Sequence, residues 1–266
     1  MTERMNHFQQ KEKHVFVPFI TAGDPSPDST VELALTLEAN GASALELGIP
    51  YSDPLADGPV IQRASLRALQ QGMTLEKAMT LVGTMREKGL TIPVIIFTYY
   101  NLLLQLGEQT FYEQALRNGI DGLLVPDLPF EESESLRKGC EEHDLSLISL
   151  VAPTTSPERL AHIGAQAHGF LYCISSLGVT GTRSSFSTDV MSFLEKAKAA
   201  TSIPVLIGFG LSHKTQMQAF ESQCDGFIVG SAIVKKIEEL GPDLVNEETR
   251  DTALGAFSTY IAQLVP

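Results

Sequence analysis

The sequence predicts an α/β fold, a (β/α)₈ TIM barrel with all 266 residues in a single domain. Short runs rich in Val, Ile, Leu and Phe recur along the chain and are separated by longer segments with helical patterning. Strands that alternate with helices are parallel and joined by right-handed crossovers, so about eight runs in this length favour a closed barrel over an open doubly wound sheet. The predicted strands are residues 15–21, 44–49, 94–99, 122–125, 145–151, 169–174, 205–209 and 226–229.

The intervening helices carry recognisable start signals. Ser26-Pro27-Asp28 precedes a helix over 30–40, Ser156-Pro157-Glu158 opens a later one, and Asp189 precedes a helix over 190–200. Serine or aspartate just before a helix, and proline at its first position, are each typical of a helix N-terminus. These signals fall between the predicted strands, as an alternating fold requires.

Three segments are longer than a minimal barrel needs. Residues 1–13 are predicted to form an extra N-terminal helix that closes the bottom of the barrel. Residues 51–59 and 175–189 follow the second and sixth strands at the end where barrel active sites lie. The second of these loops is rich in Gly, Ser and Thr, and a loop of this length in a compact domain favours a functional lid.

Composition limits the possible partners and the compartment. The net charge of −13 argues against a general nucleic-acid or anionic-membrane surface, although one phosphate can still be held by backbone N–H groups. The three cysteines are widely spaced, and the polar N-terminus lacks the apolar centre of a secretory signal. No apolar run reaches the roughly 20 residues that span a bilayer. We therefore expect a folded cytoplasmic protein.

Glu46 is the first candidate catalytic residue. In the second predicted strand, Leu45 and Leu47 share one face, while Ala44, Glu46 and Gly48 share the other. If the leucines pack against helices, Glu46 points into the barrel, where loss of water raises a carboxyl pKa and makes it a usable general acid or base. The alternative is a structural ion pair, but no Lys or Arg lies nearby in the sequence.

Asp53 and Asp57 follow on the next loop. Asp before Pro and Asp before Gly are also ordinary turn residues, so the pattern alone leaves both interpretations open. Their proximity to Glu46 makes them candidates for the same site.

A phosphate site is predicted at the ends of the last two strands. Gly208-Phe209-Gly210 closes the seventh strand, and Gly230-Ser231 closes the eighth before a helix. In barrels these two loops and a helix N-terminus often bind phosphate, and glycines let backbone amides approach its oxygens. Glycines also mark ordinary tight turns, so the prediction rests on the two loops together.

Aromatic residues and the absence of certain motifs limit the kinds of reaction that the chain could catalyse. Phe19 and Tyr172 could line a flat apolar pocket or simply fill the core. The predicted strands contain no lysine for a Schiff base, the histidines lack metal-ligand spacing, and no dinucleotide motif follows the first strand. The substrate must therefore supply its own electron sink. An indole does so, because protonation at C3 creates an electrophilic iminium.

The run LELGIPYSDPLADG is similar throughout to a signature of the tryptophan synthase alpha chain family, and three further motifs fit that family in the same order. The matching segments are residues 18–25, 45–58, 178–181 and 208–210.

The resemblance implies a lyase that cleaves indole-3-glycerol phosphate into indole and glyceraldehyde 3-phosphate by a retro-aldol reaction. It assigns Glu46 as the acid-base residue and Asp57 as the group that hydrogen-bonds the indole N–H and stabilises positive charge in the ring. Phe19 and Tyr172 would line the indole pocket. Thr180 would help to close the lid over Asp57.

The same resemblance extends to the phosphate and to a partner. Backbone amides near Gly181, Gly210 and Ser231 would hold the phosphate. The family works as an α₂β₂ assembly whose beta chain carries pyridoxal phosphate, so no cofactor is expected in this chain. The loop with Asp53 and the lid with Thr180 would lie near the partner. Many members carry arginine where this chain has Ser176, so anchoring of the lid can differ here.

Two other hypotheses are compatible with the residues. One is a phosphate-binding barrel that isomerises or epimerises a phosphosugar. The other is a non-catalytic regulatory subunit, against which the presence of both Glu46 and Asp57 argues. An assay for indole release separates the lyase from both.

Overall fold

The computed structural model describes residues 1–10, 15–174, 188–208, 210–211 and 213–265. Nine short strands form one parallel sheet in the order β5-β4-β3-β2-β1-β9-β8-β7-β6. The strands are β1 (Val15–Thr21), β2 (Leu45–Gly48), β3 (Val94–Phe97), β4 (Gly122–Leu124), β5 (Ser146–Leu147), β6 (Ser149–Val151), β7 (Leu171–Ile174), β8 (Val205–Gly208) and β9 (Gly226–Val229).

The sheet closes through the segment that contains β5 and β6. These two strands stand at opposite ends of the sheet order, yet only Ile148 separates them in the chain. The sequence predicts one strand over 145–151, and the structure breaks it at this residue because β5 pairs with β4 and β6 pairs with β7. The predicted (β/α)₈ barrel is confirmed, and the other predicted strands recur with ends within two residues.

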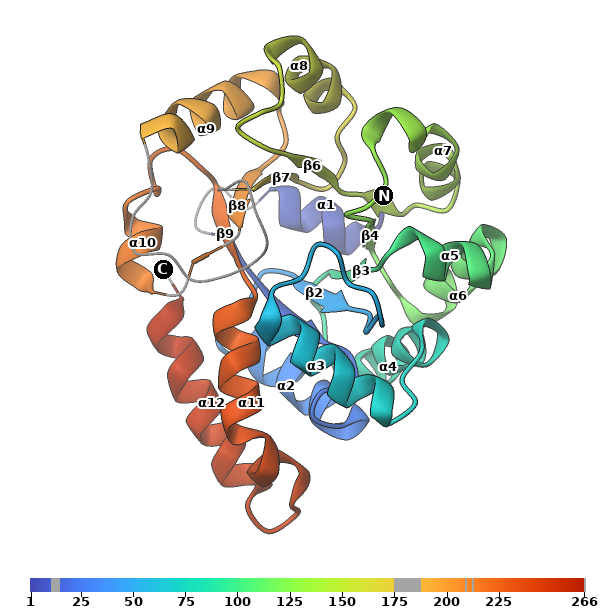
Figure 1. Cartoon of the computed structure of the whole chain (residues 1–266), viewed down its shortest axis with the longest axis vertical. Coiled ribbons are helices and arrows are strands. Elements are labelled where there is room, and N and C mark those ends of the chain that lie inside the picture. Colours follow the sequence, from blue (N-terminus) through green and yellow to red (C-terminus); the bar gives the residue numbers. More distant parts are fainter. Residues whose placement is uncertain (11–14, 175–187, 209, 212, 266) are drawn as a thin grey trace.

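Helices surround the sheet (Figure 1). Their bounds are α1 (Glu3–Gln9), α2 (Pro27–Ala39), α3 (Pro59–Gln70), α4 (Leu75–Glu87), α5 (Tyr100–Leu106), α6 (Glu108–Asn118), η1 (Phe130–Glu132), α7 (Glu134–Glu142), α8 (Pro157–Ala165), α9 (Thr188–Ala200), α10 (Lys214–Gln218), α11 (Ser231–Val245) and α12 (Arg250–Leu264). Ser26 and Ser156 cap α2 and α8 as predicted, each accepting a hydrogen bond from a first-turn N–H. Helix α9 begins at Thr188, two residues before the predicted start.

The predicted N-terminal helix is present and closes the bottom of the barrel. In α1, Met5 and Phe8 are buried, and the Phe8 ring lies 5.7 Å from that of Phe170. Arg4 pairs with the fully buried Asp121, which precedes β4, at 2.9 Å. Because these contacts lie at the amino ends of the strands, the helix leaves the opposite end of the barrel free for chemistry.

Side-chain alternation separates two apolar layers. Leu45 and Leu47 of β2 belong to the layer between sheet and helices, whereas Ala44 belongs to the cluster inside the barrel. Phe19 and Phe97 belong to the same inner cluster. Glu46 therefore projects into an apolar interior, as its place in the strand predicts.

Candidate active site

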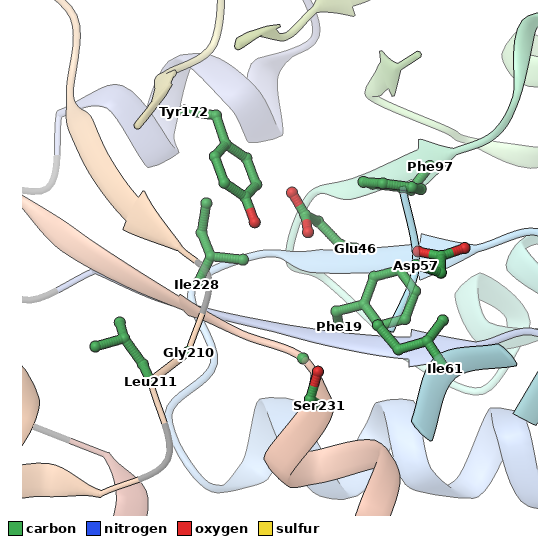
Figure 2. Close-up of a pocket in the computed structure, with 11 residues that line it drawn as sticks. Phe19, Glu46, Asp57, Ile61, Phe97, Tyr172, Gly210, Leu211, Ile228 and Ser231 are labelled. Carbon is green, nitrogen blue, oxygen red and sulfur yellow. The ribbon is translucent and has the colours of Figure 1, made fainter. Parts of the chain in front are cut away.

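One pocket at the carboxyl ends of the strands collects most of the predicted site residues. About 490 Å³ of space there is not filled by protein atoms, and this volume includes open solvent at the mouth of the pocket. Side chains and backbone from β1, β2, β3, β7, β9 and the loops after β2 and β8 form its wall (Figure 2). The residues that line it are Phe19, Glu46, Asp57, Ile61, Phe97, Tyr172, Gly210, Leu211, Ile228, Gly230 and Ser231.

Glu46 lies in the wall of this pocket with almost no exposed surface. Its register partners are Phe19 on β1 and Ile95 on β3, and its exposed fraction is 1%. Among the described residues, nothing hydrogen-bonds to its Oε1 atom. Loss of hydration raises the pKa of Glu46 to about 8, because burial disfavours the charged form. The side chain can thus hold a proton at neutral pH and exchange it with a bound ligand.

Tyr172 faces the same carboxyl group from across the barrel. Figure 2 shows its hydroxyl directed toward Glu46. Burial raises the pKa of Tyr172, and the nearby Glu46 raises it further. The phenol therefore stays neutral and presents a polar edge to the pocket beside the carboxyl group.

Asp57 lies on the loop after β2 and its side chain reaches the pocket from the side of α3. The Tyr99 hydroxyl donates a hydrogen bond to Asp57 Oδ2 at 3.1 Å, and the Gln62 amide donates to the Asp57 carbonyl at 2.8 Å. Burial raises the pKa of Asp57 to about 6, although the bond from Tyr99 acts in the opposite direction. Asp57 is therefore mostly ionised at neutral pH, while Glu46 is mostly protonated.

Apolar side chains line the pocket beside the two carboxyl groups. Phe19 and Phe97 meet edge to face with ring centroids 5.5 Å apart. Gly48 makes room for this arrangement, because a Cβ there would lie 2.3 Å from Phe19 Cζ. Ile61 and Ile228 complete the wall. A slot with these walls suits a flat aromatic group.

Gly230 and Ser231 form the polar end of the pocket. Gly230 precedes α11 and Ser231 is its first residue, so the helix N-terminus points at the cavity. First-turn N–H groups have no acceptor within a helix, and together with the helix dipole they favour an anion. Gly210, whose φ is +82°, lies on the neighbouring loop. This end can hold a phosphate group through amides and one hydroxyl.

Gly208 has a different surrounding from the other predicted phosphate contacts. It is not among the residues that line the pocket, and a Cβ there would lie 2.4 Å from the Tyr172 hydroxyl. Its lack of a side chain therefore makes space for Tyr172. Thr180, Gly181 and Phe209 lie outside the described residues, as does the predicted lid except for Thr188 and Asp189.

Asp53 is separate from this pocket. It is exposed on the loop after β2 and accepts a hydrogen bond from the Ser52 hydroxyl at 2.8 Å. Together with Tyr51 and Asn101 it lines a different hollow on the outside of the barrel.

Several pocket residues were not predicted from the sequence. Ile61, Leu211 and Ile228 carry no chemical signal that distinguishes them from core residues. Phe97 could have been found by alternation, since β3 presents Ile95 and Phe97 to the interior. Tyr99 follows that strand, and only the fold brings its hydroxyl to Asp57.

The described part of the chain contains no group of three His, Cys, Asp or Glu side chains that could hold a metal ion. Nor does any described helix combine the length and apolar character needed to cross a membrane.

Comparisons with known proteins agree on one family. The family model for the tryptophan synthase alpha chain matches residues 5–262. The alpha chain of Halalkalibacterium halodurans is 56% identical over 254 residues, which cover 96% of each chain. The alpha chain of Bacillus subtilis is 54% identical over 251 residues, which cover 94% of each.

Solved structures give the same result. Tryptophan synthase subunit alpha from Legionella pneumophila superposes with a TM-score of 0.87 at 33% identity, covering 99% of this chain and 97% of that one. A chain of the tryptophan synthase α₂β₂ complex from Pyrococcus furiosus gives 0.85 at 34% identity, covering 96% and 99%. By sequence and by structure, the chain belongs to the tryptophan synthase alpha chain family.

Proposed function

We propose that this chain is a lyase of tryptophan biosynthesis that cleaves indole-3-glycerol phosphate into indole and glyceraldehyde 3-phosphate. Membership of the alpha chain family supports this reaction. The observation that carries the residue assignment is the carboxyl group of Glu46, which is buried in the pocket wall with Asp57 and the α11 N-terminus on the same cavity.

In this proposal Glu46 moves both protons. It first donates a proton to indole C3, which produces a cationic iminium in the ring. Its carboxylate then takes the proton of the side-chain hydroxyl next to the ring, and the carbon-carbon bond breaks. The bond electrons return to the ring and form indole, while the alcohol becomes the aldehyde. Glu46 ends protonated, as it began, which suits a pKa of about 8.

Asp57 is proposed to stabilise the cationic ring. Its carboxylate would accept a hydrogen bond from the indole N–H, where positive charge develops. A fixed negative charge in an apolar site lowers the energy of that state more than it could in water. The bond from Tyr99 supports this role because it holds one carboxylate oxygen in place.

The two ends of the pocket fit the two ends of the substrate. Phe19, Phe97 and Tyr172 are proposed to enclose the indole, and amides near Gly210 and Ser231 to bind the phosphate. Thr180 and Gly181 are kept as proposed lid and phosphate contacts on the basis of the motif they belong to.

The proposed partner is a tryptophan synthase beta chain in an α₂β₂ assembly. A similar chain from Pyrococcus furiosus belongs to a complex of that composition. Pyridoxal phosphate would belong to the beta chain, and the reaction proposed here uses side chains alone. The exposed loop with Asp53 is proposed to face the partner. We also propose that residues 1–266 form one domain and that the protein is cytoplasmic.

Release of indole from indole-3-glycerol phosphate, followed by absorbance with and without a beta chain, tests the function. The Glu46→Gln variant should lose about 10²- to 10⁴-fold in turnover yet still bind substrate, because the amide cannot transfer the proton. Glu134→Gln, on the exposed face of α7, is the matched control and should retain full activity. Normal turnover by Glu46→Gln would overturn the assignment. Failure of the natural chain to release indole, alone or with its partner, would reject the lyase.

A further inference from the structure

A cluster of four charged residues connects α3, α11 and the loop after β1. Arg67 binds Asp24 through two hydrogen bonds of 2.7 and 2.9 Å, and its third nitrogen donates to Glu238 at 2.6 Å. Arg63 binds the same Glu238 through two further bonds of 2.8 and 2.7 Å. The cluster balances two positive charges against two negative ones.

This cluster differs from an ordinary surface ion pair in burial and geometry. Asp24 is only 2% exposed, and Arg67 and Glu238 are each about one-third exposed or less, whereas Arg63, at the outer end of the cluster, is 52% exposed. Planar guanidinium groups that bind carboxylates through two bonds fix direction as well as distance. A network of this kind holds its helices in one relative position, whereas an isolated exposed pair contributes little.

Both helices carry site residues at their amino ends. Helix α3 starts at Pro59, two residues after Asp57, and α11 starts at Ser231. The two helices lie side by side in Figure 1. Glu238 is seven residues, or about 10 Å of helix, from Ser231. The same cluster therefore fixes the helix behind the Asp57 loop and the helix behind the phosphate end of the pocket.

We propose that the bridge from Arg67 to Glu238 sets the spacing between the indole-binding and phosphate-binding halves of the site. Arg67 and Glu238 are positioning residues and lie outside the residues that line the pocket. The inference rests on the proposed function, because the distance between the two halves affects the binding only of a ligand with an aromatic ring at one end and a phosphate at the other. A displacement near 1 Å at a reacting centre can cost about 10²-fold in rate.

The test compares ligands that fill one half of the site with a ligand that spans both. Indole and glyceraldehyde 3-phosphate are the two fragments. Indole-3-propanol phosphate joins a ring to a phosphate and lacks the hydroxyl needed for cleavage. In Glu238→Ala, the affinity for the spanning ligand should fall about tenfold more than the affinity for either fragment, and kcat should fall with it. Glu238→Gln, which keeps an acceptor for both arginines, should recover part of the loss.

Arg159→Gln is the matched control, because Arg159 also binds a glutamate, Glu131, through two bonds, at 2.6 and 3.0 Å, but on another face of the barrel. It should leave all three affinities unchanged. Equal losses for fragments and spanning ligand in Glu238→Ala, or unchanged affinities, would overturn the inference. A larger loss for the spanning ligand in the control Arg159→Gln would also overturn it. If the natural chain releases indole, the proposed function holds and only this inference fails.

Discussion

The Tyr99 hydroxyl donates a hydrogen bond to Asp57 Oδ2 at 3.1 Å and accepts one from the Ala56 backbone N–H at 2.9 Å. The ring of Tyr99 also packs on Tyr51, with centroids 4.9 Å apart. One side chain from the end of β3 thus orders the loop that follows β2. The position of the Asp57 carboxylate depends on this contact between the segments that follow two neighbouring strands.

Removal of this hydroxyl should change the titration of Asp57. In Tyr99→Phe the ring packing is kept, but the bond that lowers the pKa of Asp57 is lost, so that pKa should rise above about 6. The acidic limb of a plot of kcat/KM against pH should move to higher pH, with a loss of about 3- to 30-fold near neutrality. An unchanged acidic limb would show that Tyr99 has no electrostatic effect on Asp57.

The natural enzyme should show a bell-shaped dependence of kcat/KM on pH. Activity should fall below about pH 6 as Asp57 takes up a proton, and above about pH 8 as Glu46 loses the proton that it must donate. In Glu46→Asp, any residual activity should have its basic limb displaced. A profile that stays flat from pH 5 to 9 would contradict both assignments.

Replacement of Asp57 by asparagine keeps the shape of the side chain and removes its charge. Turnover of Asp57→Asn should fall about 10²-fold, because the cationic ring loses its counter-charge. The acidic limb of its pH profile should disappear as well, since asparagine does not titrate. Single-turnover measurements of indole release would show whether the loss lies in the chemical step. A fall in substrate affinity alone would argue for a binding role only.

The buried Glu46 should lower stability at alkaline pH. Its pKa is raised from an ordinary value of 4.5 to about 8, so unfolding releases a proton between these values and the free energy of unfolding falls as pH rises through this window. Every tenfold change in the acid dissociation constant corresponds to about 1.4 kcal/mol. Glu46→Gln should therefore melt above the natural chain at pH 8.5 and close to it at pH 4.5. Equal differences in Tm at the two pH values would contradict a raised pKa.

Substitutions at Gly48 and Phe19 should have non-additive effects on stability. In Gly48→Ala the new Cβ would meet the Phe19 ring at 2.3 Å, so the ring must move into the slot proposed for indole. Stability should fall by about 1–3 kcal/mol and KM should rise. Adding Phe19→Leu should restore much of the stability. The control Gly255→Ala, where nothing lies within 4 Å of the added carbon, should be neutral or slightly stabilising.

Much of the barrel could be predicted from the chain because its signals are local. Alternation within 44–48 set the inward face of Glu46, and serines before proline set the starts of α2 and α8. The break of the predicted 145–151 strand at Ile148 was not visible, because it arises where one segment pairs with β4 and β7 at opposite ends of the sheet. The sequence of residues 145–151 alone does not specify which strands will lie beside them.

The sequence by itself determined the alternating fold, the inward carboxyl group, and the glycines and serine at the ends of the last two strands. The tertiary structure alone decided that Ile228 would line the same pocket as Glu46, that Tyr99 would hold Asp57, and that Arg67 would connect Asp24 with Glu238. Spacing along the chain fixes which face of its own strand or helix a side chain occupies. Which side chains from distant elements meet depends on closure of the barrel and the packing of helices around it.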